Sequence, residues 1–386
     1  MKIGILTLWW SEDNYGQLLQ CYAMQKCLQD MGHYVYLIRY HPLNDYVKSS
    51  IRRKILKVFN PVSLYNYLLF KRRENLNRRE KRNNPRGFGI FRNKYIEQST
   101  KIYYSHKDLV ENPPSADIYI VGSDQVWNMF GGQADKAVNV INVYFLNFGG
   151  SAIKRISYAA SFGREKNELD NNFINMITPL LKKFDYVSVR EKSGLEICKQ
   201  CDIDNVELVP DPTMLLHKKI YRALYESDVN IKKPTSSYCF LYLVGNEFDF
   251  SLQSIYDWAK GKHIEVIYVT GNSQQDKYKK TYATIPEWIY LLDHAEYVIS
   301  NSYHCAVFSL LFMKKFAAIP LVGNDKGMNS RFDTLFHQFN IEKKFLSYDF
   351  SILDKDIDRQ SVSDTFKNIR DTCQLSEIIS GKTECP

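Results

Sequence analysis

Short apolar runs recur along the chain, and each ends in polar or glycine residues. The first half contains KIGILTL, YVYLIRY, DIYIVGS, RISYAASFG, YVSVRE and VELVPD. Beyond residue 236 the pattern restarts with SYCFLYLVG, IEVIYVT, EYVISNS and FAAIPLVG, separated by helical stretches. Runs that are apolar on both faces are typical of parallel strands covered by helices. We therefore expect an α/β fold with two Rossmann-like, doubly wound domains that face each other across a cleft.

A polar stretch around residues 217 to 236 separates these two series of strands. A chain of 386 residues is long enough for two domains that each bury a core. We predict an N-terminal domain over residues 1–220, a C-terminal domain over 235–345, and a tail over 346–386 that packs back on the N-terminal domain. The segment GQLLQCYAMQKCLQDMG predicts an amphipathic helix that ends at a glycine.

Positive charge is concentrated in one segment of the first domain. Residues 48–94 carry fifteen Lys and Arg residues and two acids, whereas the whole chain has a net charge of +8. The apolar clusters ILKVF and LYNYLLF interrupt these cations. We predict a basic helical insertion over about residues 45–95. Such a segment suits peripheral contact with an anionic membrane, and a solvated insertion is the alternative. We expect no nucleic-acid partner, because no recognition motif accompanies the charge.

Composition limits where the chain works and what it binds. With 45% hydrophobic and 24% charged residues and no apolar run near 18 residues, the sequence predicts a globular protein without a membrane span. The N-terminus lacks the apolar region and cleavage site of a signal peptide. We expect a cytoplasmic location, with a peripheral position at the inner face of the cell membrane as the alternative. Cys198 and Cys201 form one C-x-x-C without the second pair that a zinc site needs, so we expect no metal.

Polar side chains follow many of the predicted strands at the point where each strand ends. In open parallel sheets, ligands bind outside these carboxyl ends. SEDNYGQ, VGSDQVWN, SVREKSG and LVPDPTML place the following residues there: Asn14, Gly16, Ser123, Asp124, Gln125, Arg190 and Asp211. Any one of them alone would be interpreted as a cap or turn residue. Several such ends in one domain indicate a binding site.

Six motifs of the chain resemble, in order, those of the polysaccharide pyruvyl transferase family. They are DNYGQLLQCYAMQKCL, VGSDQVWN, SYAASFG, VSVREKSG, LVPDPTML and NSYHCAVFSLLFMKKF. The resemblance extends from about residue 3 to residue 341. Many members have Arg or Phe before the motif histidine and Gly after it, where this chain has Tyr303 and Cys305.

This resemblance implies both an activity and a fold. The activity is transfer of the pyruvyl group of phosphoenolpyruvate onto a sugar of a bacterial surface polysaccharide, such as an exopolysaccharide or capsule, or of its lipid-linked precursor. The product is a ketal and phosphate is released. The implied fold resembles the two-domain (GT-B-like) glycosyltransferases. Phosphoenolpyruvate is a co-substrate, and no further cofactor is expected.

Phosphoenolpyruvate carries a carboxylate and a phosphate, so its site needs cations or aligned N–H donors. SNSYHCAVFSLLF predicts a helix whose first turn follows a strand and supplies such donors. The residues that we predict to bind phosphoenolpyruvate are Arg190, Ser302, His304, Lys326 and Arg331. Lys326 is expected in a flexible loop and Arg331 at the start of an amphipathic helix. We expect Arg190, His304 and Arg331 to line one cleft.

Ketal formation needs a general acid, a base for the sugar hydroxyls and fixed positive charge near the phosphate. His304 and Asp124 are the best proton carriers in the motifs, although His304 could serve only as a phosphate donor and Asp124 only as a turn cap. His294 and His337 are interpreted as structural, with His337 on an exposed helix face. The residues that we predict to bind the acceptor sugar are Asn14, Tyr15, Gly16, Ser123, Asp124, Gln125 and Trp127.

The sequence is also compatible with two other classes of function. A GT-B-type nucleotide-sugar glycosyltransferase of polysaccharide synthesis would show similar strand-end residues, and fold alone does not separate the two activities. A non-catalytic scaffold that docks on a membrane through the basic segment is the other alternative. The order of the six motifs favours pyruvyl transfer.

Overall fold

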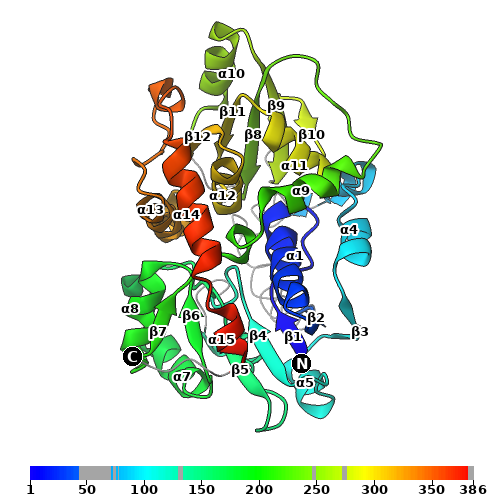
Figure 1. Ribbon diagram of the computed structural model, residues 1–386, viewed down its shortest axis with the longest axis vertical. Coiled ribbons are helices and arrows are strands. Elements are labelled where there is room, and N and C mark those ends of the chain that lie inside the picture. The colour runs from blue at the N-terminus through cyan, green and yellow to red at the C-terminus, as the bar shows by residue number, and fades with distance from the viewer. Residues whose placement is uncertain are drawn as a thin grey trace, which may run out of the picture.

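The computed structural model describes residues 1–42, 71–72, 75–76, 78–128, 134–245, 249–271 and 276–380. The clusters ILKVF and LYNYLLF of the predicted basic insertion lie outside the described residues. Two parallel sheets, one above the other in Figure 1, form the centres of two α/β domains.

The first domain is built on a five-stranded parallel sheet with the order β3-β2-β1-β4-β5. Its strands are β1 (Lys2–Leu6), β2 (Tyr34–Tyr40), β3 (Gln98–Tyr103), β4 (Ile118–Val121) and β5 (Lys154–Ser157). The short strands β6 (Val187–Val189) and β7 (Val206–Leu208) extend this sheet. They do so because Ile156 at β5 forms a bridge with Tyr186 beside β6.

The second domain repeats this arrangement with the order β10-β9-β8-β11-β12. Its strands are β8 (Tyr238–Val244), β9 (Glu265–Gly271), β10 (Lys280–Thr281), β11 (Tyr297–Ser300) and β12 (Lys315–Ala318). Counted along the chain, both sheets have the strand order 3-2-1-4-5, which is that of the Rossmann fold. The prediction of two Rossmann-like domains is confirmed.

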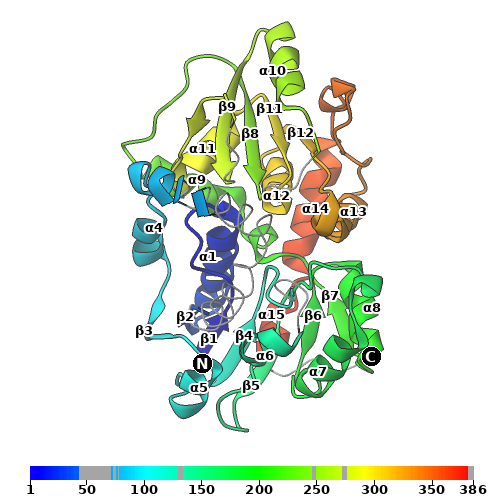
Figure 2. The same cartoon turned by 180° about the vertical axis from the view of Figure 1, so that it is seen from behind.

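Helices cover the sheets of both domains (Figure 2). Those of the first are α1 (Tyr15–Asp30), α4 (Phe88–Tyr95), α5 (His106–Glu111), α6 (Ala134–Tyr144), α7 (Asn171–Leu181) and α8 (Lys192–Gln200). Those that follow are α9 (Lys218–Glu226), α10 (Leu252–Gly261), α11 (Ile285–His294), α12 (Tyr303–Leu311), α13 (Ser330–Gln338), α14 (Arg359–Asp371) and α15 (Leu375–Ser380). Four 3-10 helices complete the elements: η1 (Lys166–Glu168), η2 (Pro212–Met214), η3 (Gly323–Asn329) and η4 (Phe350–Leu353). Among the described residues, none of these helices is both long and apolar enough to span a bilayer.

The central strands are buried on both faces, as their continuous apolar sequences predict. Ile5 of β1 pairs with Leu37 of β2 and with Ile120 of β4, and all three side chains are buried. Branched apolar side chains on both faces of such strands pack against the covering helices. This register brings the carboxyl ends of β1 and β4 to the same edge of the sheet.

Helix α1 differs from the sequence prediction. It is followed by Gly32 in the left-handed region, with φ of +84°, as a helix-ending glycine should be. However, α1 is buried around most of its surface and is not amphipathic. The reason is that the second domain covers the side that would otherwise face solvent: Tyr15 of α1 stacks on Trp288 of α11, with ring centroids 5.3 Å apart.

The two domains share one continuous apolar core through this contact. The hydroxyl of Tyr15 donates to the Ala283 carbonyl at 2.6 Å, and its ring also packs against Tyr242 of β8. Residues of both domains belong to the same buried cluster. A large apolar interface of this kind holds two domains in a fixed relative position.

The last two helices contact both domains. In Figure 1, α14 runs down from the second domain and α15 continues beside the first. Phe366 of α14 packs on Phe339 after α13, with ring centroids 4.6 Å apart. Lys154 of β5 donates to the Ile378 carbonyl of α15 at 2.7 Å.

The polar stretch between the two series of strands contains α9. This helix packs on α11 through the ion pair of Arg222 with Asp293 at 2.7 Å.

Candidate active site at the domain interface

Residues that follow five strands come together between the domains. From the first domain come the start of α1 after β1, Asp124 after β4 and Arg190 after β6. From the second comes His304, in the first turn of α12 after β11. Asp211, which caps η2 beyond β7, lies among them. The parallel sheets place these residues at one interface because all of them follow the carboxyl ends of strands.

The carboxylate of Asp211 is the centre of this cluster and is fully buried. It accepts hydrogen bonds from Ser123 Oγ at 2.6 Å, from Arg190 Nη1 at 2.9 Å and from both the amide and the hydroxyl of Thr213, at 3.0 and 2.7 Å. Nε2 of His304 lies 3.3 Å from its Oδ2. Asp211 thus connects the last strand of the first domain to the first turn of α12.

These neighbours keep Asp211 ionised. Burial by itself raises the pKa of a carboxyl group. At Asp211 the adjacent His304 imidazole, the charge of Arg190 and the hydrogen bond from Ser123 oppose this effect, and the pKa lies well below its usual range. The cluster therefore contains a fixed negative charge beside the imidazole.

His304 is held in place by the packing of α1 against α12. Its side chain is only 5% exposed. A Cβ atom at Gly16 of α1 would lie 2.2 Å from Nδ1 of this imidazole, which is far below van der Waals contact. The glycine therefore leaves the space that the ring occupies. Nε2 of His304 has no well-directed hydrogen bond among the described residues, although it faces Asp211 at 3.3 Å.

Arg190 is buried, but only some of its guanidinium donors make hydrogen bonds. Its Nη1 donates to Asp211, whereas Nε and Nη2 have no hydrogen-bond partner among the described residues. Carboxylates lie beyond hydrogen-bonding distance on these sides: Glu191 at 3.6 Å from Nε and Asp124 at 3.7 Å from Nη2. Two edges of the guanidinium thus lack a hydrogen bond among the described residues, although each faces a carboxylate at ion-pair distance.

Arg331 of α13 brings a second guanidinium to the same place. Its carbon Cζ lies 5.9 Å from the ring centroid of Tyr303, and Cζ of Arg190 lies 4.6 Å from the same centroid. Arg331 donates from Nε to the Met328 carbonyl at 3.0 Å, and among the described residues it makes no ion pair. Burial and repulsion from Arg190 lower the pKa of Arg331 to about 10.

An unpaired charge buried in this way is unfavourable by itself, because it has lost its hydration. Arg331 is only 7% exposed. An anion that contacts Arg331 would remove this cost through charge-assisted hydrogen bonds. Arg331 is therefore the cation of this cluster that is suited to bind an anionic group of a ligand, whereas Arg190 already lies among three carboxylates.

The other predicted phosphoenolpyruvate ligands occupy different positions. Ser302 is the N-cap of α12, and its Oγ accepts from the Cys305 amide at 3.4 Å. Lys326 is exposed on η3. The prediction of a flexible loop at Lys326 is wrong, because the segment that leads into α13 forms a 3-10 helix.

The residues predicted to bind the acceptor divide into two groups. Ser123 is bonded to Asp211, while Asn14 at the start of α1 and Gln125 are half-buried. Trp127 instead lies in the core of the first domain, where its indole donates to the Tyr144 carbonyl at 3.0 Å. Tyr15 is fully buried in the domain contact. We assign these two aromatic residues to packing.

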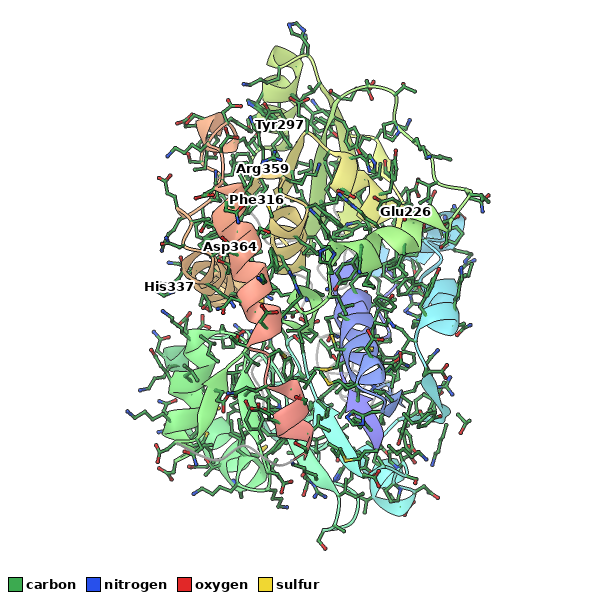
Figure 3. All side chains as sticks on the ribbon, in the orientation of Figure 1. Glu226, Tyr297, Phe316, His337, Arg359 and Asp364 are labelled. Atoms are coloured by element: carbon green, nitrogen blue, oxygen red, sulfur yellow. The ribbon has the colours of Figure 1, made fainter. Side chains whose placement is uncertain are left out.

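His294, His337, Cys198 and Cys201 lie outside the cluster, and their contacts indicate structural roles. His294 stacks on Tyr290 and lies 2.9 Å from its carbonyl. His337 lies on the exposed face of α13, at the margin of the molecule in Figure 3. Cys198 and Cys201 are buried free thiols, and burial raises the pKa of each. The described residues contain no group of three or more His, Cys, Asp or Glu arranged to hold a metal ion.

Two members of the cluster, Glu191 and Tyr303, were not predicted, and Asp211 was placed at the ligand-binding edge without a role. Glu191 is fully buried and accepts from Ser161 Oγ at 2.6 Å. Tyr303 forms the aromatic surface between the two arginines. Asp211 had a signal in the sequence, because it follows the apolar run VELVP at a strand end. For Glu191 and Tyr303, the only signal in the sequence was that they are adjacent to Arg190 and His304.

Comparison with known proteins places the chain in a family. The model of the polysaccharide pyruvyl transferase family matches residues 14–321. No curated protein gives a significant match. This family match contains Asp124, Arg190, Asp211 and His304, whereas Arg331 lies beyond it.

Several solved structures are similar to the chain at low sequence identity. UDP-GlcNAc 2-epimerase from Methanocaldococcus jannaschii has a TM-score of 0.48 at 12% identity, covering 99% of this chain and 100% of its own. The enzyme of the same name from Neisseria meningitidis has 0.42 at 10% identity, covering 96% and 92%. The glycosyltransferase SnogD from Streptomyces nogalater has 0.39 at 8% identity, covering 98% and 96%. Likenesses this weak carry no argument about function.

The family match covers well over half of the 386 residues. It also runs through both domains, from the residue that precedes α1 to the segment after β12. The chain therefore belongs to the polysaccharide pyruvyl transferase family.

Proposed function

We propose that the protein transfers the pyruvyl group of phosphoenolpyruvate onto two hydroxyls of a sugar in a bacterial surface polysaccharide or its lipid-linked precursor. Family membership supports pyruvyl transfer to polysaccharide in general. The single observation that supports phosphoenolpyruvate as the donor is the buried guanidinium of Arg331, which makes no ion pair among the described residues. Arg190 lies against the same Tyr303 ring, and its Nε and Nη2 make no hydrogen bond within the described part of the chain.

The reaction conserves atoms without an oxidant or a reductant. A proton adds to the methylene carbon of phosphoenolpyruvate, and the adjacent carbon becomes electrophilic. One sugar hydroxyl attacks this carbon and loses its proton. A second hydroxyl then displaces phosphate and loses its proton, which closes the ketal. The enzyme must supply one proton to carbon and accept two from the hydroxyls, one of which replaces the proton supplied and the other of which goes to the departing phosphate.

Arg331 and Arg190 are the proposed contacts of the two anionic groups of the donor. A planar guanidinium pairs with carboxylate or phosphate through two parallel hydrogen bonds. Each charge-assisted bond contributes about 1.5–3 kcal/mol. Because Arg190 is already oriented by Asp211, it loses little side-chain freedom when it binds the donor.

His304 is the proposed proton carrier at the reacting carbon. Asp211 lies on its Nε2 side and stabilises the protonated imidazole, in the way that a buried aspartate orients the histidine of a hydrolase triad. Asp124, 3.7 Å from Nη2 of Arg190, is the proposed base for a sugar hydroxyl. Asn14 and Gln125 are proposed acceptor contacts, because both side chains are half-buried near the start of α1 and after β4.

We also propose that the basic segment brings the enzyme to an anionic membrane that carries the acceptor. The support is the concentration of cations between residues 48 and 94. Each cation near such a surface contributes about 1 kcal/mol, and salt weakens the attraction. Co-sedimentation should then recover the protein with anionic vesicles but not with neutral ones. Equal recovery with both would reject this location.

The proposed activity is tested by incubating the protein with phosphoenolpyruvate and a panel of lipid-linked and nucleotide-linked sugars. We expect phosphate release that requires both components, together with an acceptor that gains a pyruvyl ketal by mass spectrometry. Turnover of a nucleotide sugar in the absence of phosphoenolpyruvate would reject pyruvyl transfer and favour a glycosyltransferase.

A further inference from the structure

A cationic pocket lies beside the domain interface, on the carboxyl-terminal part of the basic segment. Its volume is about 340 Å³. The residues that line it are Glu12, Lys81, Arg82, Asn84, Pro85, Arg86, Gly87, Phe88, Gly89 and Ile90. This volume lies near the lower end of the range for small-molecule sites, about 300–1,000 Å³. None of the described residues of the Asp211 cluster lines it.

Arg86 is the unusual residue of this pocket. It is only 7% exposed, and its Nη1 has no hydrogen-bond partner among the described residues. Its guanidinium carbon lies 5.2 Å from the ring centroid of Tyr282 in the second domain. No carboxylate lies within ion-pair distance of Arg86 in the part of the chain that the structure describes. A buried guanidinium without an anion is costly, so Arg86 indicates a missing anionic partner.

The amino end of α4 opens into the same pocket. Its N-cap, Gly87, is in the left-handed region and supplies no side-chain cap. The amides of Phe88, Gly89 and Ile90 are the first of this helix and have no intrahelical acceptor. Free amides and the helix dipole together favour an anion at this end. Arg86 and the helix end are independent features that point to the same kind of ligand.

The remaining charges of the pocket leave it cationic. Lys81 is paired with Asp13 at 2.6 Å. Arg82 is exposed at the rim, and it makes no ion pair with any residue that the structure describes. Glu12 is the acid of the pocket wall; burial lowers the pKa of Arg92, and the nearby charge of Glu12 partly opposes this effect. The pocket thus offers two arginines and three amides to an anion with several oxygens.

The pocket is connected to the active site by Tyr15. Phe88 in the pocket wall packs on the Tyr15 ring, with centroids 4.9 Å apart. Gly16, the next residue, contacts the His304 imidazole. The pocket wall and the His304 imidazole are therefore joined by packed side chains at the start of α1.

We propose that this pocket binds the diphosphate group through which the acceptor sugar is attached to its carrier. The identification of this diphosphate with the acceptor rests on the proposed pyruvyl transfer. The binding of a diphosphate by the pocket does not. The pocket would hold the carrier end while Asn14 and the start of α1 direct the sugar to the reacting carbon.

The test is isothermal titration with inorganic pyrophosphate and inorganic phosphate in the presence of excess phosphoenolpyruvate. Wild-type protein should bind pyrophosphate at least tenfold more tightly than phosphate. Arg86→Gln should weaken pyrophosphate binding by roughly ten- to a hundredfold, which is the effect of one or two lost charge-assisted bonds. The matched control is Arg79→Gln, which removes the same charge from an exposed position of the same segment and should bind as wild type does.

Three results would overturn the proposal. They are equal pyrophosphate binding by Arg86→Gln and wild type, equal affinity of the wild type for phosphate and pyrophosphate, and a parallel loss of phosphoenolpyruvate binding in Arg86→Gln. Phosphate as tight as pyrophosphate would identify a site for the free product. If Arg86→Gln does not fold, Arg82→Gln removes a cation from the rim of the same pocket and should weaken pyrophosphate binding in the same direction. Failure of pyruvyl transfer would leave these binding results unchanged, so the two proposals are tested separately.

Discussion

Nε2 of His304 lies 3.3 Å from Oδ2 of Asp211, although His304 begins a helix of the second domain and Asp211 follows the last strand of the first. The same carboxylate also accepts a hydrogen bond from Arg190 at 2.9 Å. One buried anion therefore holds the proposed proton carrier and a proposed donor-binding cation in a fixed arrangement. The geometry of the site depends on the two domains being packed together.

Asp211→Asn should destabilise the protein in a pH-dependent way. The pKa of Asp211 is lower in the folded protein than in the unfolded chain. Its ionised form therefore stabilises the fold above the unfolded-state pKa of about 3.9, and this contribution is lost as the pH falls below that value toward the folded-state pKa. We expect a loss of about 3–5 kcal/mol at pH 7, because Arg190 and His304 lose their buried anion.

Urea unfolding at pH 7 and at pH 3 measures this difference. The difference in the free energy of unfolding between the wild type and Asp211→Asn should be smaller at pH 3 than at pH 7. Asp364→Asn on α14, an exposed residue in Figure 3, is the control and should change stability by less than about 0.5 kcal/mol. A gap that stays constant with pH would show that Asp211 does not act through its charge.

Gly16→Ala should impair catalysis more than folding. The new methyl group would lie 2.2 Å from Nδ1 of His304, so the imidazole must move. Displacing a proton carrier by about 1 Å can cost on the order of a hundredfold in rate. The control is Gly261→Ala, where a Cβ meets no atom within 4 Å. Turnover is measured as phosphate release, and equal rates for the two variants would place His304 outside the reaction.

His304→Ala should lower pyruvyl transfer by about a hundredfold or more while the fold is retained, because it removes either a proton carrier or a phosphate contact. His337→Ala removes an imidazole from the exposed face of α13 (Figure 3) and should have normal activity. Circular dichroism confirms folding before the rates are compared. A folded His304→Ala protein with near-normal turnover would return this residue to a packing role.

Sequence alone predicted much of the fold because parallel strands that are buried on both faces leave a clear apolar pattern. It also predicted that Arg190, His304 and Arg331 belong together, since each follows a strand or starts a helix. Here Arg190 and Arg331 lie against the Tyr303 ring, and Arg190 and His304 lie beside Asp211. The central place of Asp211 could not be derived, because it depends on contacts among strand ends far apart in the chain.

Other features were missed for the same physical reason. Trp127 follows a strand and carries a polar N–H, but packing against Phe145 places it in the core. The amphipathic prediction for α1 was wrong because a second domain covers its outer side. The strand β10 has only two residues, which is too short to leave a periodic pattern.

Arg190→Gln and Arg331→Gln should affect stability differently. Arg190 is bonded to Asp211 and lies near two other carboxylates, so its removal leaves buried anions uncompensated, at a cost of about 3–5 kcal/mol. Arg331 makes no ion pair among the described residues, so its removal should change stability by about 1 kcal/mol or less. Urea unfolding of both variants without ligand decides this, and equal losses would contradict the assignment of Arg331 as an unpaired cation.

The most direct test of the proposed donor site is calorimetric titration of phosphoenolpyruvate into the wild type and into Arg331→Gln. The site described here predicts that the wild type binds the donor without an acceptor. Arg331→Gln, with its fold retained, should bind it about 10- to 150-fold more weakly, since a charge-assisted bond of about 1.5–3 kcal/mol is lost. Absence of binding by the wild type, or equal affinity of the two proteins, would contradict the assignment of Arg190, Arg331 and His304 as the phosphoenolpyruvate site.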